Sequence, residues 1–185
     1  MIKGIIFDMV GTLLQKNPEY ILDEVVETAE NIKNKFPNDE EFINALEENE
    51  ITKRYSLEEI AQKIVSKYCK IPEIWNTLLP KLKENYKLGI INNGTAITIP
   101  YFKKVNNFDE FFSTFINSSE INIEKPDSRI YLVALKQMNL KPEECVFIDD
   151  TIDNVLGAEK VGMKGVLFTD YQKLVIDLKS LNINV

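Results

Sequence analysis

Short apolar runs alternate along this chain with longer stretches in which apolar residues recur at helical spacing. The short runs predict five strands, at residues 2–8, 88–92, 112–116, 145–149 and 165–168. Three of them are almost continuously apolar, as expected of strands that are buried on both faces. The alternation predicts an α/β fold, a Rossmann-like parallel sheet with crossover helices.

The segment between the first two predicted strands holds more helical signals than one crossover needs. Helix starts are predicted at Asn17-Pro18, at Asn38 with Glu41, at Ser56 with Glu59, and at Pro72. Pro80 should bend the last of these helices because it lacks an amide hydrogen. We therefore expect a small α-helical subdomain at 15–71, inserted into a core made of 1–14 and 72–185.

Charge and hydropathy narrow the classes of partner. The chain has 185 residues and a net charge of −7, and its Lys and Arg residues do not cluster, so no nucleic-acid partner is expected. No apolar run approaches the roughly 18 residues of a membrane helix. Asp8 and Gly11 interrupt the first apolar run, which does not fit a signal peptide. The sequence thus predicts a cytoplasmic protein without a membrane partner, and no pattern indicates an oligomeric state.

The chain contains no histidine and two isolated cysteines. This composition excludes Ser-His-Asp and Cys-His catalysis, and it excludes a zinc site built on histidine. Acid–base chemistry must then rest on carboxylates, lysine, tyrosine or water. A bound metal would need oxygen ligands, which favours Mg²⁺.

Polar motifs follow four of the predicted strands. Asp8 ends the first strand, Asn92-Asn93-Gly94 follows the second, Lys125 follows the third, and Asp149-Asp150 follows the fourth. In an open parallel sheet these motifs meet at the carboxyl edge, where such sheets bind ligands. A carboxylate nucleophile, a lysine, Mg²⁺ and amide donors are together suited to phosphoryl transfer, in which negative charge must be neutralised.

These motifs resemble those of the haloacid dehalogenase-like (HAD) hydrolases. The resemblance covers Asp8-Met9-Val10-Gly11-Thr12, Asn92-Asn93-Gly94-Thr95, Glu124-Lys125-Pro126-Asp127 and Asp149-Asp150-Thr151-Ile152-Asp153-Asn154, in that order. It extends from residue 2 to about residue 168, nearly the whole core. It implies a HAD-like core with a helical cap inserted after the first strand, and a Mg²⁺-dependent hydrolase of small phosphorylated metabolites, in the phosphoric monoester hydrolase class.

The resemblance also implies roles for individual residues. Asp8 would be the nucleophile and, with Lys125, would form the catalytic pair. The residues implied for binding substrate are Asn92, Asn93, Gly94 and Lys125. The ligands implied for the metal are the Asp8 and Asp150 carboxylates and the Val10 carbonyl oxygen, with Asp149 and Asn154 holding the metal ligands or their waters.

The chain departs from the family motif at Val10, where phosphatases of the superfamily carry a second aspartate that acts as general acid–base. Three interpretations remain open. The chain is a phosphatase that relies on good leaving groups or solvent, or a relative that cleaves phosphonates or carbon–halogen bonds, or a weak binding or regulatory module. Phosphonate cleavage would need a cap lysine as Schiff base, from the set Lys16, Lys33, Lys35, Lys53, Lys63 and Lys67.

Overall fold

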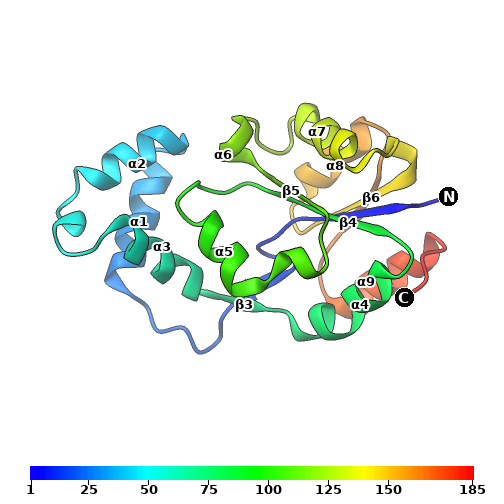
Figure 1. The fold of residues 1–185 in the computed structure, drawn as a ribbon, viewed down its shortest axis with the longest axis horizontal. Helices are drawn as coiled ribbons and strands as arrows, with labels where there is room; N and C mark the ends of the chain where they lie inside the picture. Colours follow the sequence, from blue (N-terminus) through cyan, green and yellow to red (C-terminus); the bar gives the residue numbers. More distant parts are fainter.

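The computed structural model describes residues 1–185 and has at its centre a five-stranded parallel sheet (Figure 1). The strands are β1 (Gly4–Phe7), β4 (Lys87–Asn92), β5 (Thr114–Asn117), β6 (Cys145–Asp149) and β7 (Lys164–Leu167), in the spatial order β5-β4-β1-β6-β7. The parallel α/β core predicted from the sequence is therefore confirmed. All five strands lie within two or three residues of their predicted positions.

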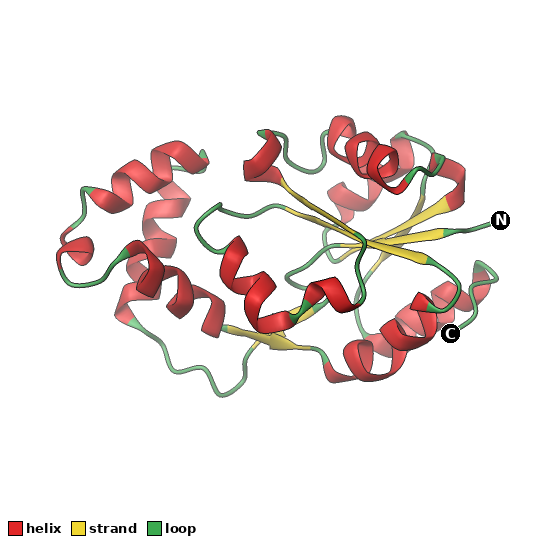
Figure 2. Ribbon diagram, in the orientation of Figure 1, coloured by secondary structure: helices red, strands yellow, loops and turns green.

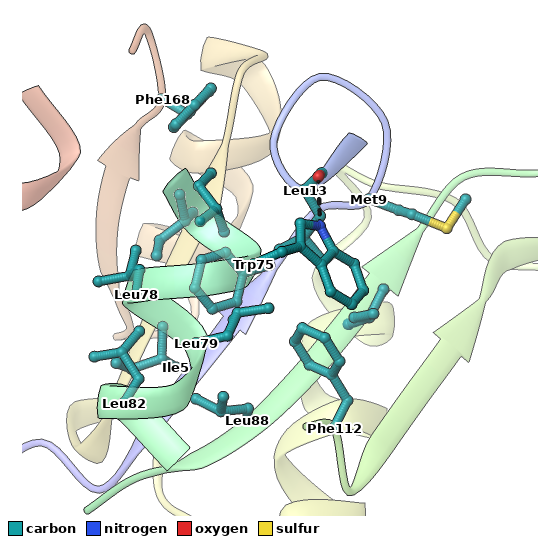
Figure 3. Packing of buried hydrophobic residues seen from close by; sticks show 14 of the residues in the cluster. Ile5, Met9, Leu13, Trp75, Leu78, Leu79, Leu82, Leu88, Phe112 and Phe168 are labelled. Carbon is teal, nitrogen blue, oxygen red and sulfur yellow. Dashed lines mark hydrogen bonds between the residues drawn. The ribbon is translucent and has the colours of Figure 1, made fainter. Parts of the chain in front are cut away.

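Helices cover both faces of the sheet, and each face has its own apolar cluster. On one face Ile5 and Phe7 of β1 pack with Trp75, and with leucines of α4 (Leu79–Lys83) and α9 (Tyr171–Ser180) (Figure 3). On the other face Ile6 packs with α7 (Ser128–Met138) and α8 (Ile152–Lys160). Strand β1 is thus buried on both sides, which explains why its sequence is continuously apolar.

Three helices form a separate group at one end of the molecule (Figure 1). They are α1 (Glu24–Lys35), α2 (Asp39–Glu47) and α3 (Leu57–Ser66), with a 3₁₀ turn at Glu50–Lys53. Their cluster of buried apolar residues, Val25, Ala29, Ile32, Phe42, Leu46, Ile51 and Ile60, is separate from the two clusters of the sheet. We call residues Glu24–Ser66 the helical insertion.

A short antiparallel ribbon that the sequence did not reveal connects the insertion to the sheet (Figure 2). It pairs β2 (Leu14–Lys16) with β3 (Tyr68–Lys70), one strand on each side of the insertion. The indole Nε1 of Trp75 also donates to the Leu13 carbonyl at 2.8 Å (Figure 3). The two chain ends of the insertion are therefore held together where they meet the core.

The helix start expected at Asn17-Pro18 is wrong. Helix α1 begins at Glu24, where the Asp23 side chain accepts from the Val25 amide at 2.8 Å. Asn17 instead caps a single turn by accepting from the Glu19 amide. The capping box of Ser56 and Glu59 is confirmed at the start of α3.

The remaining short elements complete the core. They are α5 (Ile99–Asn106), α6 (Ser118–Ile121), and 3₁₀ turns at Phe108–Glu110 and Pro142–Glu144. Before Pro80 the helix irregularity that the sequence predicts takes the form of a π-helical turn at Ile74–Leu78. Because the proline has no amide hydrogen to donate, the regular helical bonding pattern is interrupted there.

Candidate active site

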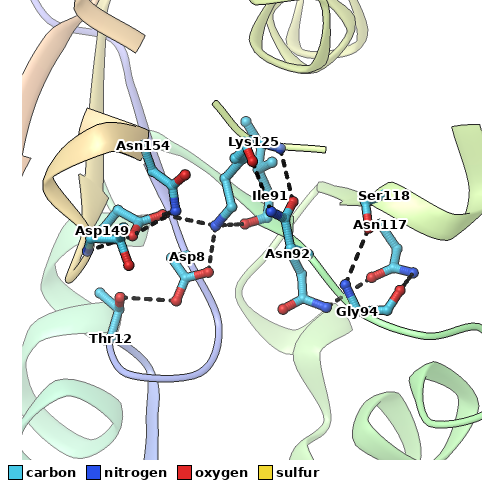
Figure 4. Close-up of polar contacts among 12 residues, drawn as sticks. Asp8, Thr12, Ile91, Asn92, Gly94, Asn117, Ser118, Lys125, Asp149 and Asn154 are labelled. Carbon is cyan, nitrogen blue, oxygen red and sulfur yellow. Dashed lines mark hydrogen bonds and ion pairs between the residues drawn. The ribbon is translucent and has the colours of Figure 1, made fainter. Parts of the chain in front are cut away.

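The carboxyl ends of four parallel strands bring polar side chains to one edge of the sheet (Figure 4). Asp8 follows β1, whereas Asn92, Asn117 and Asp149 are the last residues of β4, β5 and β6. These four residues are all buried. Strand β1 lies between β4 and β6. From β1 the chain continues to β4 and β5 on one side, and it then returns to β6 and β7 on the other side, so the strand order reverses at β1. Ligands bind α/β sheets beside such a reversal of strand order.

The Lys125 ammonium links two of these strand ends. Its Nζ atom lies 2.5 Å from Asp8 Oδ1 and 2.8 Å from Asp149 Oδ2, and it donates to the Ile91 carbonyl at 3.0 Å. The exposed fraction of its side chain is 1%. A buried ammonium is tolerated only when its hydrogens have partners, and here three acceptors supply them.

Asp149 is held by donors from three directions. Besides Lys125, the Thr151 amide donates to its Oδ1 atom at 2.8 Å, and the Asn154 amide lies 3.1 Å from both carboxylate oxygens. This arrangement fixes the Asp149 carboxylate, and through it the position of Lys125. Asp149 therefore contacts both Lys125 and Asn154.

Asp150 is exposed but lies next to the two buried carboxylates. One oxygen of each of Asp8, Asp149 and Asp150 falls within 4.8 Å of the others. Gly11 makes the approach possible, because a Cβ atom at this position would lie 2.2 Å from Asp150 Oδ2. Its φ of +101° is also a backbone conformation that favours glycine.

Burial and the neighbouring Asp149 carboxylate raise the pKa values of Asp8 and Asp150. Burial raises the pKa of Asp8 to about 6, against the lowering effect of the Lys125 ammonium, and the Asp149 carboxylate raises it further. Burial and the Asp149 carboxylate also raise the pKa of Asp150. Three carboxylates thus surround one ammonium, and the cluster has an excess of negative charge.

The donor set fits a hard divalent cation. Carboxylate oxygens are the ligands that Mg²⁺ prefers, and the cluster offers neither histidine nor cysteine. A cation of charge +2 would also compensate the negative charge that raises the pKa values of Asp8 and Asp150. The residues present therefore fit the metal that the sequence predicts.

Comparison with known proteins supplies the family. The family model described as haloacid dehalogenase-like hydrolase matches residues 2–162. The chain belongs to this family. Its HAD-like fold also agrees with solved structures: a predicted HAD-like hydrolase of Porphyromonas gingivalis shares 22% identity at a TM-score of 0.74, with 100% of both chains covered. A HAD family enzyme of Bacteroides thetaiotaomicron, in complex with magnesium and inorganic phosphate, shares 22% identity at a TM-score of 0.70, covering 94% of this chain and 99% of that one.

Two curated relatives have phosphatase names. The glyceraldehyde 3-phosphate phosphatase of Methanothermobacter thermautotrophicus is 31% identical over 121 residues, which cover 62% of this chain and 53% of the relative. That of Pyrococcus furiosus is 35% identical over 112 residues, covering 59% and 46%. The chain spans about half the length of the curated relatives it matches. None of its helices has the length and apolar composition needed to cross a membrane.

The loop expected to bind phosphate, at Asn92, Asn93 and Gly94, uses hydrogen-bond donors of Asn92 and Gly94 in contacts with the end of β5 and the start of α6. The Asn92 amide donates to Asn117 Oδ1 at 2.8 Å, and the Gly94 amide donates to Ser118 Oγ at 3.2 Å. Asn117 in turn donates to the Gly94 carbonyl at 2.8 Å. The loop is therefore at the predicted edge but is organised by the end of β5. In Figure 4 the Asn92 carbonyl oxygen lies on the side of Asp8.

The Asn93 side chain contacts the main chain of Lys125. Asn93 Oδ1 accepts from the Lys125 main-chain amide at 2.9 Å, and Asn93 Nδ2 donates to the Lys125 carbonyl at 3.0 Å.

The sequence patterns did not point to three further residues: Thr12, Asn117 and Ser118. Thr12 Oγ1 donates to Asp8 Oδ2 at 3.2 Å. Asn117-Ser118 follows a predicted strand directly, so the strand-end rule that identified Asp8 could have identified this pair.

Val10, the departure from the family motif, is half-buried and packs against the apolar cluster of the Trp75 face. Its side chain offers no proton to a leaving group. The Thr12 hydroxyl beside Asp8 is the polar side chain that the same loop supplies instead.

Proposed function

We propose that this HAD-family chain hydrolyses phosphate monoesters of small metabolites, with Asp8 as the nucleophile and Mg²⁺ as the cofactor. The observation that carries the proposal is the contact of Lys125 with both Asp8 and Asp149, next to Asp150. The Lys125 ammonium, together with a bound Mg²⁺, would supply the positive charge that a phosphate dianion needs before a carboxylate can approach it. The phosphatase names of the relatives support the same reaction class.

The chemistry follows from the residues. Asp8 Oδ2 or Oδ1 forms a bond to phosphorus while the bond from phosphorus to the alcohol oxygen breaks, which gives an aspartyl-phosphate. The leaving oxygen takes its proton from water, because Val10 has none to give. Water then attacks the phosphorus atom, and Asp8 and inorganic phosphate are released. Lys125 neutralises charge on the phosphoryl oxygens, and Asp149 keeps the ammonium in position.

We assign the metal to the Asp8 and Asp150 carboxylates and the Val10 carbonyl oxygen, with Asp149 and Asn154 as supporting residues. When bound, Mg²⁺ would supply positive charge next to the phosphoryl group. Asp149 suits the supporting role, since Lys125, Thr151 and Asn154 already occupy its oxygens.

We also propose that residues 15–71 act as a cap over this site, with 1–14 and 72–185 as the catalytic core. The separate apolar cluster of the helical insertion supports this division. So does the β2–β3 ribbon, which closes the insertion at its base. The cap would then contact the alcohol part of the substrate.

A screen of an aryl phosphate, an alkyl phosphate, a phosphonate and a haloacid, each with and without Mg²⁺, tests the proposal. We expect Mg²⁺-dependent release of phosphate, fastest from the aryl ester. Phosphonate or halide release without phosphatase activity would overturn it, and saturable phosphate binding without turnover of any compound would indicate a binding module. Four of the six lysines considered as Schiff-base candidates, Lys33, Lys53, Lys63 and Lys67, form ion pairs with carboxylates, which disfavours that role.

A further inference from the structure

A polar cavity of about 330 Å³ lies between the helical insertion and the core. Eight of its nine lining residues are charged, polar or glycine, and the ninth is Pro37. Those used below are Lys33, Asn38, Asp39, Gly94, Ser119 and Glu124. The first three belong to the end of α1 and the start of α2, and the others to the core. Figure 1 shows the start of α2 and helix α6 on the two sides of this region. Its volume is at the lower end of the range for ligand pockets.

The cavity is lined by residues from two segments that also contribute to the proposed site. Gly94 belongs to the loop after β4 that Asn117 and Ser118 organise, and Glu124 precedes Lys125 in the chain. The same loop reaches the insertion, where the Ala96 amide donates to Asp39 Oδ2 at 3.0 Å and Ile97 packs on the apolar cluster. The segment from Gly94 to Ile97 therefore connects the loop expected to bind phosphate with the helical insertion, which forms the other wall of the cavity.

The charges that line the cavity do not balance. The Lys33 ammonium donates to the Pro37 carbonyl at 2.8 Å and lies 3.5 Å from Asp39 Oδ1, so its charge is compensated by Asp39. Glu124 is exposed, and none of the nine ion pairs of the chain involves it. One positive and two negative groups leave a net charge of −1 on the lining. A second anion in this space would meet uncompensated negative charge.

The uncharged lining groups suit hydroxyl groups of a ligand. Ser119 and Asn38 offer both hydrogen-bond donors and acceptors, and Pro37 is the one apolar residue among those that line the cavity. An apolar alcohol moiety would displace water from polar groups without replacing its hydrogen bonds, which weakens binding.

We propose that this cavity receives the alcohol part of the substrate and selects small phosphate monoesters whose alcohol is hydroxylated and uncharged. Glu124 is then the residue that rejects esters with a second negative charge. The inference rests on the proposed function, because it places the phosphoryl group at Asp8.

Three ligands of equal chain length separate the effect of hydroxyl groups from that of a second negative charge. They are glycerol 3-phosphate, propyl phosphate and 3-phosphoglycerate. Calorimetric titration of Asp8→Asn in the presence of Mg²⁺ measures binding without turnover. We expect glycerol 3-phosphate to bind about tenfold more tightly than propyl phosphate, since propyl phosphate lacks the two hydroxyl groups and leaves their partners in the cavity unpaired. We expect 3-phosphoglycerate to bind at least as weakly as propyl phosphate.

The added change Glu124→Gln should bring 3-phosphoglycerate to within about threefold of glycerol 3-phosphate. Glu120→Gln, which makes the same charge change on α6 outside the cavity, is the matched control and should leave the order unchanged. Equal binding of the three ligands, no binding of any of them, or equal effects of the two Glu→Gln changes would overturn the inference.

Hydrolysis of an aryl phosphate by the wild-type chain tests the proposed function separately from the cavity. If the wild-type chain does not hydrolyse an aryl phosphate but the three ligands keep the expected order, the cavity assignment stands and the enzymatic proposal falls. If the aryl phosphate is hydrolysed and the order is absent, only the cavity assignment falls.

Discussion

Asn93 and Lys125 exchange two hydrogen bonds, so that the loop after β4 carries the main chain of the lysine. Asn93 Oδ1 accepts from the Lys125 amide at 2.9 Å, and its Nδ2 donates to the Lys125 carbonyl at 3.0 Å. The side chain of Lys125 then reaches back to Asp8 and Asp149. One asparagine thus sets the position of the ammonium that holds two carboxylates from two other strands.

Replacing Asn93 with alanine should move Lys125. Both main-chain groups of Lys125 lose a partner, and each lost bond is worth about 1 kcal/mol. We expect a stability loss of about 1–3 kcal/mol in urea denaturation and a fall of at least about tenfold in kcat for an aryl phosphate. Asn34→Ala, an exposed asparagine in α1, is the control. Unchanged kcat in Asn93→Ala would show that the two hydrogen bonds do not position the lysine.

Asn117 should be more important for the fold of the loop than for chemistry. Its side chain is fully buried and bonds Asn92, the Gly94 carbonyl and Ser119 Oγ. Asn117→Ala leaves these groups unpaired, at about 1–3 kcal/mol for each that stays buried. We expect thermal unfolding at a clearly lower temperature, together with a higher KM. Wild-type stability in this variant would contradict the hydrogen-bond network that the structure shows.

The raised pKa of Asp8 predicts a pH-dependent effect of Asp8→Asn on stability in EDTA. The folded protein keeps a proton on Asp8 up to about pH 6, whereas the unfolded chain releases it near 3.8. The free energy of unfolding therefore falls as the pH rises between these values, by about 3 kcal/mol in all, and the loss is complete above pH 6.

Asp8→Asn removes this titration. At pH 7.5 we expect the variant to be more stable than wild type by up to about 3 kcal/mol, and at pH 4 we expect the advantage to disappear. Asp153→Asn, at an exposed acid of α8, is the control for the same charge change. An Asp8→Asn variant that is less stable than wild type at pH 7.5 would mean that the ion pair with Lys125 outweighs the burial of the carboxylate.

Val10→Asp tests whether a missing proton donor limits the reaction. A positioned general acid–base contributes about 10²–10⁴-fold. We expect a smaller gain, about tenfold, for an alkyl phosphate, because the half-buried site of Val10 is lined by apolar groups that do not orient a carboxylate. An aryl phosphate, whose leaving group needs no proton, should gain less. No change on either ester would remove the missing-acid explanation, and a loss of phosphonate or halide cleavage would indicate adaptation to that chemistry.

The sheet could be predicted from the sequence because its strands are buried on both faces, as β1 is. The β2–β3 ribbon could not, since three-residue strands such as Leu14–Lys16 show no periodicity. The start of α1 was misplaced because Ile21 and Leu22 have helical spacing but are 86% and 72% exposed, ahead of the cap at Asp23.

In the site, too, the sequence predicted some features and not others. Motif spacing brought Asp8, Lys125 and Asp149 together, because strand ends fix where such residues lie. Which way an amide turns is decided by its neighbours in space. Asn93 bonds Lys125 and Asn92 bonds Asn117, and each pair joins segments far apart in the sequence. Such contacts leave no trace in local spacing.

The proposed hydrolysis of phosphate monoesters depends most on Asp8 as the nucleophile. The direct test is the rate of aryl phosphate hydrolysis with Mg²⁺ by wild type and by Asp8→Asn, purified identically and checked for folding by circular dichroism. The amide is nearly the same size as the carboxylate but forms no acyl-phosphate, so we expect the rate to fall by at least about 10³-fold with the fold intact. Equal rates from the two proteins would contradict the account, since another group would then perform the reaction.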